Sequence, residues 1–260
     1  MTGPLGPLIL LHAFPVDNRL WEDVAVGLRA QGFEPIVPNL RGFGTNTDEL
    51  PAEPDLDVLA DDVAALITSA DGGPAVVAGV SMGGYVAMNL ARRHPELIAG
   101  LAFVDTKAGS DASAAVEGRL AFADRVEREG SGWVADAMVP NLISEHTMAK
   151  DATVEGRVRE QIADCPPATI AWIQRAMAKR PDSIDVIDQF DGPVLIIVGE
   201  HDLLSPPSEA VAMAEAAREA TLVEVADAGH LTPIESPKIV TSVIGDWLRE
   251  CFDSAATSAT

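Results

Sequence analysis

The sequence alternates short apolar runs with longer segments of helical periodicity. Six runs are candidate strands, at residues 7–11, 34–37, 74–80, 97–104, 193–199 and 220–225. Several of them are apolar without interruption, which is typical of strands that are buried on both faces of a parallel sheet. Candidate helices lie between the strands, at residues 19–30, 57–69, 82–93, 208–218 and 237–251. This order predicts an α/β fold with a mostly parallel sheet of about six strands flanked by helices.

The alternation stops once, between residue 107 and about residue 190. This stretch shows several helical segments, separated by GSGW, CPP and RPDS, and no strand pattern. The run PVLIIVGE that follows resumes the strand pattern, so we expect the chain on both sides to belong to one sheet. The sequence therefore predicts a core formed by residues 1–106 and 191–260, with a helical cap formed by residues 107–190. A second independent domain is the alternative interpretation.

The segment GVSMGG, residues 79–84, follows a candidate strand and opens a candidate helix. Gly79, Ser81 and Gly83 match the pattern G-x-S-x-G, which in this context is typical of a nucleophile elbow. Small neighbours allow a tight turn that leaves the serine hydroxyl clear of the backbone. The N–H of Met82, at the helix N-terminus, is placed to stabilise a developing oxyanion. The alternative is a glycine-rich helix start with a capping serine.

A serine hydroxyl needs a base that takes its proton, and the base needs a carboxylate that fixes its tautomer. His230 lies between the last candidate strand and the last candidate helix, where a loop can reach over the serine turn. Asp202 directly follows the strand 193–199, and strand carboxyl ends form the site edge of open parallel sheets. Asp105 also follows a strand and is the rival. We expect Asp202 to orient His230.

Together these features resemble the α/β-hydrolase superfamily, in which serine, acid and histidine follow in the same chain order. The loop HAFP, residues 12–15, is similar to the family's His-Gly-x-Pro loop, with Ala13 where glycine is usual. The match implies that the backbone N–H of Phe14 joins that of Met82 in an oxyanion hole. The segment GVSMGGYVAMNLARRHPELIAGLAFVDT resembles small carboxylesterases and hydrolases of the 3-oxoadipate enol-lactonase type.

The predicted function is that of a serine hydrolase, which cleaves a small ester or lactone through an acyl-enzyme intermediate. Cofactor-free haloperoxidase or perhydrolase chemistry and C–C bond hydrolysis are alternatives on the same triad. A catalytically idle ligand receptor is an alternative of another class. We expect no metal, because no cluster of His, Cys and Asp has ligand spacing. We expect no cofactor, because no glycine-rich phosphate loop follows the first strand.

Apolar side chains of the predicted cap are candidates for the substrate pocket, with packing between cap helices as the alternative. These candidates are Trp133, Met138, Trp172 and Met177. The same stretch contains basic residues, namely Arg119, Arg125, Arg157, Arg159, Arg175, Lys179 and Arg180. Most of them sit beside acidic residues or at helix ends, so we expect a neutral, largely apolar substrate. A carboxylate-bearing substrate is the alternative that the enol-lactonase resemblance implies.

Charge restricts the partners of this chain. It carries 40 acidic and 18 basic residues, a net charge of -22, which repels phosphate backbones and anionic membranes. No apolar run approaches the length of a transmembrane helix, and the N-terminus lacks the pattern of a signal peptide. We therefore expect a small-molecule substrate, no nucleic acid or membrane partner, and a cytoplasmic location. The oligomeric state has no signature in the sequence.

Overall fold

The computed structural model describes residues 6–70 and 72–258, with side chains up to residue 251. Within these residues, six strands form one sheet in the order β2-β1-β3-β4-β5-β6, and every neighbouring pair is parallel. The strands are β1 (Leu8–Leu11), β2 (Pro35–Ile36), β3 (Ala75–Val80), β4 (Ile98–Val104), β5 (Val194–Gly199) and β6 (Ala220–Val225). The prediction of an α/β fold with about six strands is confirmed.

Burial along the strands follows their place in the sheet. The inner strands β1, β3 and β5 are buried along their whole length, whereas the edge strand β6 is mostly half-buried or exposed. The other edge strand, β2, has only two residues, although the sequence predicts a run over 34–37. Pro35 and Pro38 lie within and just after it, and a proline has no N–H to donate to a neighbouring strand.

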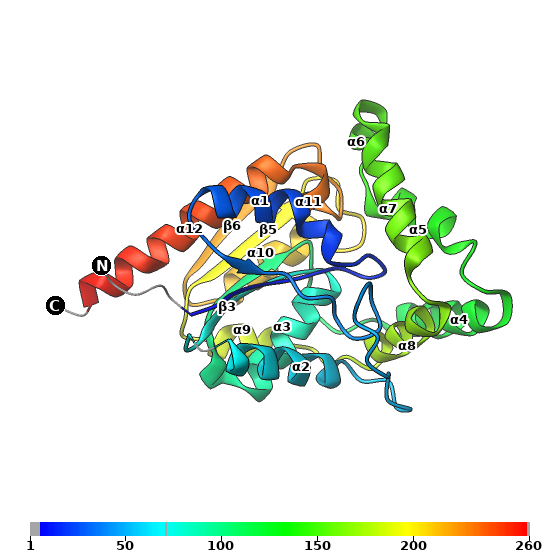
Figure 1. The fold of residues 1–260 in the computed structure, drawn as a ribbon, viewed down its shortest axis with the longest axis horizontal. Coiled ribbons are helices and arrows are strands. Elements are labelled where there is room, and N and C mark those ends of the chain that lie inside the picture. Colours follow the sequence, from blue (N-terminus) through cyan, green and yellow to red (C-terminus); the bar gives the residue numbers. More distant parts are fainter. Residues whose placement is uncertain (1–5, 71, 259–260) are drawn as a thin grey trace.

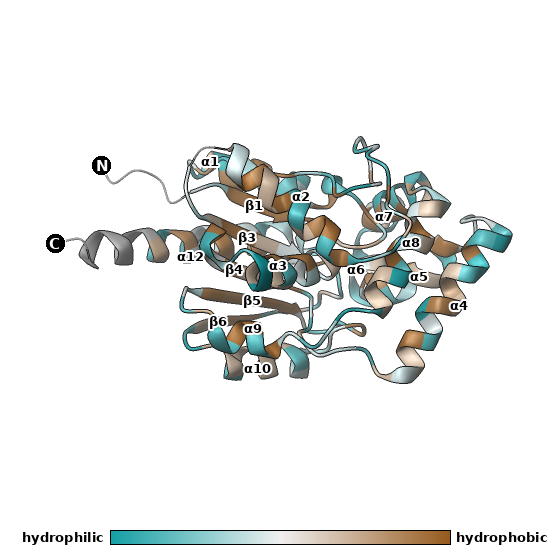
Figure 2. Ribbon diagram, turned by 90° about the horizontal axis from the view of Figure 1, so that it is seen from below, coloured by the Kyte–Doolittle hydropathy of each residue, from teal (hydrophilic) through white to brown (hydrophobic). Residues whose placement is uncertain are grey.

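Helices cover both faces of the sheet (Figure 1). On one face α1 (Glu22–Ala30) packs against α12 (Pro237–Ser258), and on the other α2 (Leu56–Ser69) packs against α3 (Met82–Arg93). The short α9 (Ile184–Gln189) packs against α3 and α10 (Pro207–Ala216). Figure 2 shows hydrophobic strands between helices whose outer faces are hydrophilic. None of the described helices is both long and apolar enough to cross a membrane.

Five helices between β4 and β5 lie beyond one end of the sheet (Figure 1). They are α4 (Ser113–Glu129), α5 (Val134–Leu142), α6 (Glu145–Lys150), α7 (Ala152–Asp164) and α8 (Pro167–Ala178). Helix α4 packs along α8, while α5 and α6 pack against α7. We call residues 113–178 the helical insertion. The next helix, α9, lies against the sheet's own helices and is not counted with it.

The strand register brings several loops to the same edge of the sheet. Leu11 of β1 lies opposite Gly79 of β3, which in turn lies opposite Phe103 of β4. Because all six described strands are parallel, the loops that follow them leave the sheet at this edge, toward the helical insertion. The short helix α11 (Thr232–Glu235) belongs to the loop after β6. This edge holds the candidate active site.

Candidate active site

Ser81 forms the turn between β3 and α3 with a strained backbone. Its φ is 52° and its ψ is -112°, a combination that residues with a Cβ rarely adopt. Two contacts with the end of β4 hold this conformation. The N–H of Ser81 donates to the carbonyl of Val104 at 2.9 Å, and the hydroxyl of Thr106 donates to the carbonyl of Ser81 at 2.8 Å. The strain is therefore sustained by the neighbouring strand.

The two glycines of the G-x-S-x-G pattern allow strand, turn and helix to approach one another. A Cβ on Gly83 would lie 2.5 Å from the carbonyl oxygen of Leu11 in β1. A Cβ on Gly79 would overlap the backbone of Gly83 itself. Neither contact is possible without moving the backbone, so both positions exclude any side chain.

The structure brings Ser81, Asp202 and His230 together. His230 Nε2 lies 2.8 Å from Ser81 Oγ, and His230 Nδ1 lies 2.8 Å from each carboxylate oxygen of Asp202. The carboxylate is held in turn by the backbone N–H groups of Leu204 and Ser205, at 2.8 and 2.9 Å. These contacts place a proton on Nδ1 and leave the lone pair of Nε2 directed at the serine hydroxyl.

The surroundings of His230 favour its protonated form. Burial by itself lowers the pKa of the imidazole, but the charge and hydrogen bond of Asp202 raise it, with smaller contributions from Asp105 and Glu235. The balance holds the pKa of His230 above its ordinary value of 6.5. An imidazole of this kind can take a proton from a hydroxyl and be stabilised as a cation.

Asp105, the rival carboxylate, has other partners. It accepts the N–H of Gly199 at 3.0 Å, and both the N–H and the hydroxyl of Thr232 at 2.8 Å. Burial, and then the charge of Asp202, raise the pKa of Asp105 to about 8. Gly199 ends β5 and Thr232 lies two residues after His230. Asp105 thus braces the two loops of the site, and the geometry favours Asp202 as the partner of His230.

The loop after β1 is held by His12. This buried imidazole donates from Nδ1 to the carbonyl of Ala13 at 2.9 Å and accepts the N–H of Leu40 at Nε2, at 3.1 Å. Burial lowers the pKa of His12 to about 4, so the ring is neutral. Phe14, two residues after His12, lines a cavity that Ser81 also lines, and Met82 begins α3. Their roles as oxyanion donors remain a prediction.

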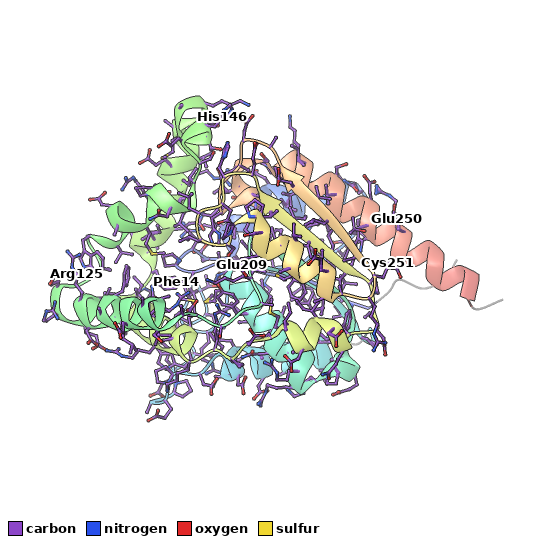
Figure 3. All side chains as sticks on the ribbon, turned by 180° about the vertical axis from the view of Figure 1, so that it is seen from behind. Phe14, Arg125, His146, Glu209, Glu250 and Cys251 are labelled. Atoms are coloured by element: carbon purple, nitrogen blue, oxygen red, sulfur yellow. The ribbon has the colours of Figure 1, made fainter. Side chains whose placement is uncertain are left out.

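The cavity has a volume of about 350 Å³ and lies between the sheet edge and the helical insertion. Ser81, His230 and Phe14 line it from the core, and Figure 3 shows Phe14 between the insertion helices and the sheet. Met138 and Met177 line it from the insertion. The two methionines proposed for the pocket from the sequence are therefore at the cavity.

The two tryptophans proposed with them are placed elsewhere. Among the described residues, neither Trp133 nor Trp172 is part of the cavity lining. Trp133 packs against Phe122, with the guanidinium of Arg125 3.8 Å from its ring centroid. Trp172 donates from Nε1 to the carbonyl of Pro51 at 2.6 Å, which ties α8 to the loop before α2. Both side chains fasten the helical insertion instead of lining the cavity.

A sequence model of the alpha/beta hydrolase fold matches residues 6–237. The chain belongs to the α/β-hydrolase fold family. The predicted family is thereby confirmed.

Solved structures resemble this α/β hydrolase over most of its length. A thermophilic esterase from Thermogutta terrifontis, determined with malate bound, is 40% identical with a TM-score of 0.91, over 96% of this chain and 92% of that one. The enol-lactonase of Burkholderia xenovorans LB400 is 26% identical with a TM-score of 0.85, over 95% and 92%. A pimeloyl-[acyl-carrier protein] methyl ester esterase of Neisseria meningitidis is 27% identical over 97% of this chain and 80% of that protein.

One wall of the hydrolase cavity is polar, and of its residues reasoning from the sequence had considered only Arg119. Its residues are Lys107, Asp111, Arg119, Asn141 and Gln174. Arg119 donates from Nε to Asp111 at 2.6 Å and from Nη1 to Gln174 at 3.2 Å. These residues come from a loop and from three helices far apart in the sequence, so no motif connects them.

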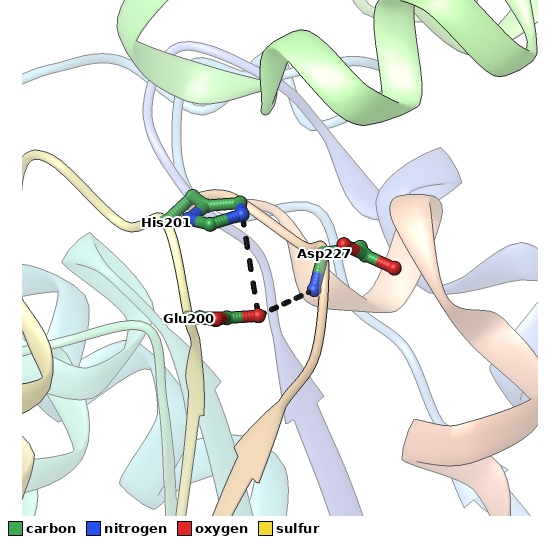
Figure 4. A group of neighbouring side chains, drawn as sticks. All are labelled: Glu200, His201 and Asp227. Carbon is green, nitrogen blue, oxygen red and sulfur yellow. Dashed lines mark hydrogen bonds and ion pairs between the residues drawn. The ribbon is translucent and has the colours of Figure 1, made fainter.

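A second polar group lies on the surface of the hydrolase, beside the loops of the site (Figure 4). Glu200, His201 and Asp227 are exposed, and their ligand atoms lie within 4.8 Å of one another, close enough to hold a metal ion. The N–H of Asp227 donates to Glu200 Oε2 at 3.0 Å, and His201 Nε2 lies 4.0 Å from the same oxygen. These contacts tie the loop that carries Asp202 to the loop that carries His230.

Proposed function

We propose that this α/β hydrolase is a serine esterase that cleaves a small carboxylic ester or lactone. The observation that carries the proposal is the line of hydrogen bonds from Asp202 through His230 to Ser81, each 2.8 Å long, at the cavity. The resemblance to an esterase and an enol-lactonase supports ester-type chemistry.

In the first half-reaction, Ser81 Oγ attacks the ester carbonyl carbon while His230 Nε2 takes the hydroxyl proton. The N–H groups of Phe14 and Met82 hold the carbonyl oxygen as it becomes negative. The tetrahedral intermediate then breaks its bond to the alcohol oxygen, which receives the proton from His230. The acyl group remains as an ester on Ser81.

In the second half-reaction, His230 takes a proton from a water molecule whose oxygen attacks the acyl carbon. The bond from that carbon to Ser81 Oγ breaks, and the serine oxygen recovers the proton from His230. The net change is one ester and one water converted into one acid and one alcohol. With a lactone, both groups stay in one molecule.

The segment 107–190 is proposed to act as a cap over this site. Met138 and Met177 from its helices add apolar surface to the cavity, and such surface excludes water from the reacting atoms. Trp172 supports this arrangement because its hydrogen bond to Pro51 fixes α8 to the core.

Covalent labelling tests the proposal. A fluorophosphonate should add its mass to the wild-type protein and not to Ser81→Ala, which should retain the fold. Ser205→Ala is the matched control, since Ser205 also lines the cavity without contacting His230 Nε2, and it should still gain the label. An equal mass shift in wild type and Ser81→Ala, or no shift in either, would contradict the proposal. Turnover of a p-nitrophenyl ester separates an esterase from an idle receptor.

A further inference from the structure

The polar wall of the cavity carries more positive than negative charge. Asp111 is paired with Arg119 at 2.6 Å, Arg180 at 3.0 Å and Lys107 at 3.4 Å. The side chains of Asp111 and Arg180 are only 2% and 3% exposed. Three cations therefore share one carboxylate in a largely buried cluster, which leaves two positive charges without an anion in this cluster. Lys107 and Arg119 belong to the cavity lining, whereas Arg180 lies outside it.

Asp111 is ionised and neutralises only one of these cations. Burial raises its pKa, but the hydrogen bond from Arg119 and the charges of Arg119 and Arg180 outweigh this effect and lower it to about 2. The guanidinium groups stay charged at any ordinary pH. The excess of positive charge thus holds over the working range of an esterase.

The remaining contacts of the two arginines are not anionic. Arg119 Nη1 contacts the neutral amide oxygen of Gln174 and, at 3.6 Å, the sulfur of Met177. The guanidinium of Arg180 lies 4.2 Å from the ring centroid of Tyr85, which lines the cavity. The buried Nε of Arg180 has no hydrogen-bond partner among the described residues. Because Arg180 lies outside the cavity lining, it contributes its charge to the cluster and no direct contact to a ligand.

Two other basic residues of the insertion each have two acidic partners. Arg175 is paired with both Asp124 and Glu127, and Arg159 with both Asp136 and Glu155. For these surface residues the expectation of neutralising acidic neighbours holds. At the cavity, by contrast, the single carboxylate of Asp111 is shared by Lys107, Arg119 and Arg180, so it neutralises only one of the three charges.

We propose that this wall is a carboxylate subsite, and that the substrate is an ester or lactone carrying a second, ionised carboxylate. The inference rests on the proposed function, because it names the substrate class of the same cavity. Lys107 and Arg119 bind the free carboxylate, while the ester carbonyl lies at Ser81. Both cations retain exposed surface, 23% and 22% of their side chains, from which they reach a ligand. Hydrogen bonds between charged partners are the strong ones.

The subsite also reconciles an anionic substrate with an acidic protein. A net charge of -22 repels an anion at long range, and the local excess of positive charge reverses this repulsion inside the cavity. A volume of about 350 Å³ suits a small molecule with a short chain between its two carbonyl groups. From the acidic neighbours of the basic residues in the sequence we expected a neutral substrate. We now propose an anionic substrate in its place.

Calorimetric titration at low ionic strength tests the subsite without any catalysis. Glutarate and its neutral diamide, glutaramide, are the two probes. Glutarate should bind wild type more tightly than glutaramide, and added salt should weaken its binding. Arg119→Gln and Lys107→Gln should each weaken glutarate binding by about tenfold or more, since each removes a charged hydrogen-bond donor.

Arg128→Gln is the matched control. Arg128 lies on the same helix α4, is 67% exposed and pairs with Glu129, so its loss removes the same charge from the outer surface. Glutarate affinity should be unchanged in this variant. Equal affinity of wild type for both probes, or equal weakening by Arg128→Gln and Arg119→Gln, would overturn the subsite.

Turnover then separates the subsite from the proposed function. Monomethyl glutarate, which carries a free carboxylate, should have a higher kcat/KM than the neutral methyl glutaramate. In Arg119→Gln the kcat/KM of monomethyl glutarate relative to that of methyl glutaramate should fall. If Ser81 takes the fluorophosphonate label and both esters react equally, the subsite is wrong and the esterase stands. If Ser81 stays unlabelled while glutarate binding depends on Arg119, the esterase is wrong and the subsite stands.

Discussion

The carboxylate of Glu235 accepts the backbone N–H of Ser144 at 2.9 Å, across 91 positions of the chain. The same carboxylate accepts the N–H groups of Gly229, at 2.9 and 3.0 Å, and of Leu231, at 3.2 Å. Ser144 lies in the helical insertion, and Gly229 and Leu231 flank His230. One side chain therefore fixes the insertion and the loop of the proposed base to each other.

Glu235→Gln should impair catalysis through the position and charge environment of His230. The amide has one acceptor oxygen where the carboxylate has two, and it removes a charge that raises the pKa of His230. We expect kcat to fall by about tenfold, because small misplacements of a base are costly, and the acid limb of the pH profile to move to lower pH. Glu145→Gln, an exposed change next to Ser144, is the control. An unmoved acid limb would limit Glu235 to a structural role.

Asp202→Asn and Asp105→Asn should separate orientation of the base from bracing of the loops. Asp202→Asn should lower kcat by about 10⁴ with little loss of fold, because the histidine tautomer becomes wrong. Asp105→Asn should lower kcat far less and destabilise the fold by about 1–3 kcal/mol, since its amide meets the donors of Thr232. Steady-state kinetics and denaturant unfolding give both values. The reverse ranking in kcat would transfer the orienting role to Asp105.

The kcat/KM of the wild type should rise with pH through the pKa of His230. Below that pKa the imidazole is protonated and cannot take the serine proton. Because Asp202 and its neighbours hold the pKa above 6.5, the midpoint should lie above 6.5. In Asp202→Asn the residual activity should have a lower midpoint, since the largest raising influence is gone. A wild-type profile that is flat from weakly acid to neutral pH contradicts a histidine base.

Gly83→Ala should destabilise the turn that carries Ser81. The new Cβ would lie 2.5 Å from the carbonyl oxygen of Leu11, so β1 and α3 must separate. We expect a loss of about 1–3 kcal/mol in unfolding free energy and a lower kcat. Gly156→Ala in α7 is the control, because its Cβ would meet nothing within 4 Å; alanine is favoured there by about 0.5–1 kcal/mol. Equal effects of the two changes on Tm would refute the steric requirement.

The sheet and the meeting of Ser81, Asp202 and His230 could be predicted from the sequence. Apolar runs and helical periodicity are local patterns, and each of the six predicted strands is present. Parallel strands send their carboxyl-terminal loops to one edge, so residues far apart in the chain converge there whatever the intervening sequence. Their contact therefore followed from topology, although their catalytic roles remain predictions.

The lining of the cavity could not be predicted in the same way. Helical periodicity shows that α4, α5 and α8 each have an apolar face, but not which neighbour that face meets. Met138 and Met177 line the cavity, whereas the ring of Trp133 packs against Phe122 and the guanidinium of Arg125. Figure 3 shows Arg125 at the outer edge of the insertion. Helix packing in three dimensions decides between these two places, and the residue types alone do not.

The sequence by itself determined the α/β fold, the strained serine turn and the loops that meet above it, because local patterns and parallel topology suffice for these. Only the tertiary structure decided the charge of the cavity. Arg119 lies on α4, and Arg180 follows the end of α8, the helix that packs along α4. They are eight and 69 positions from Asp111, and both pair with its carboxylate. Coulomb interactions depend on distance in space, so neighbours in sequence do not reveal which cations remain in excess.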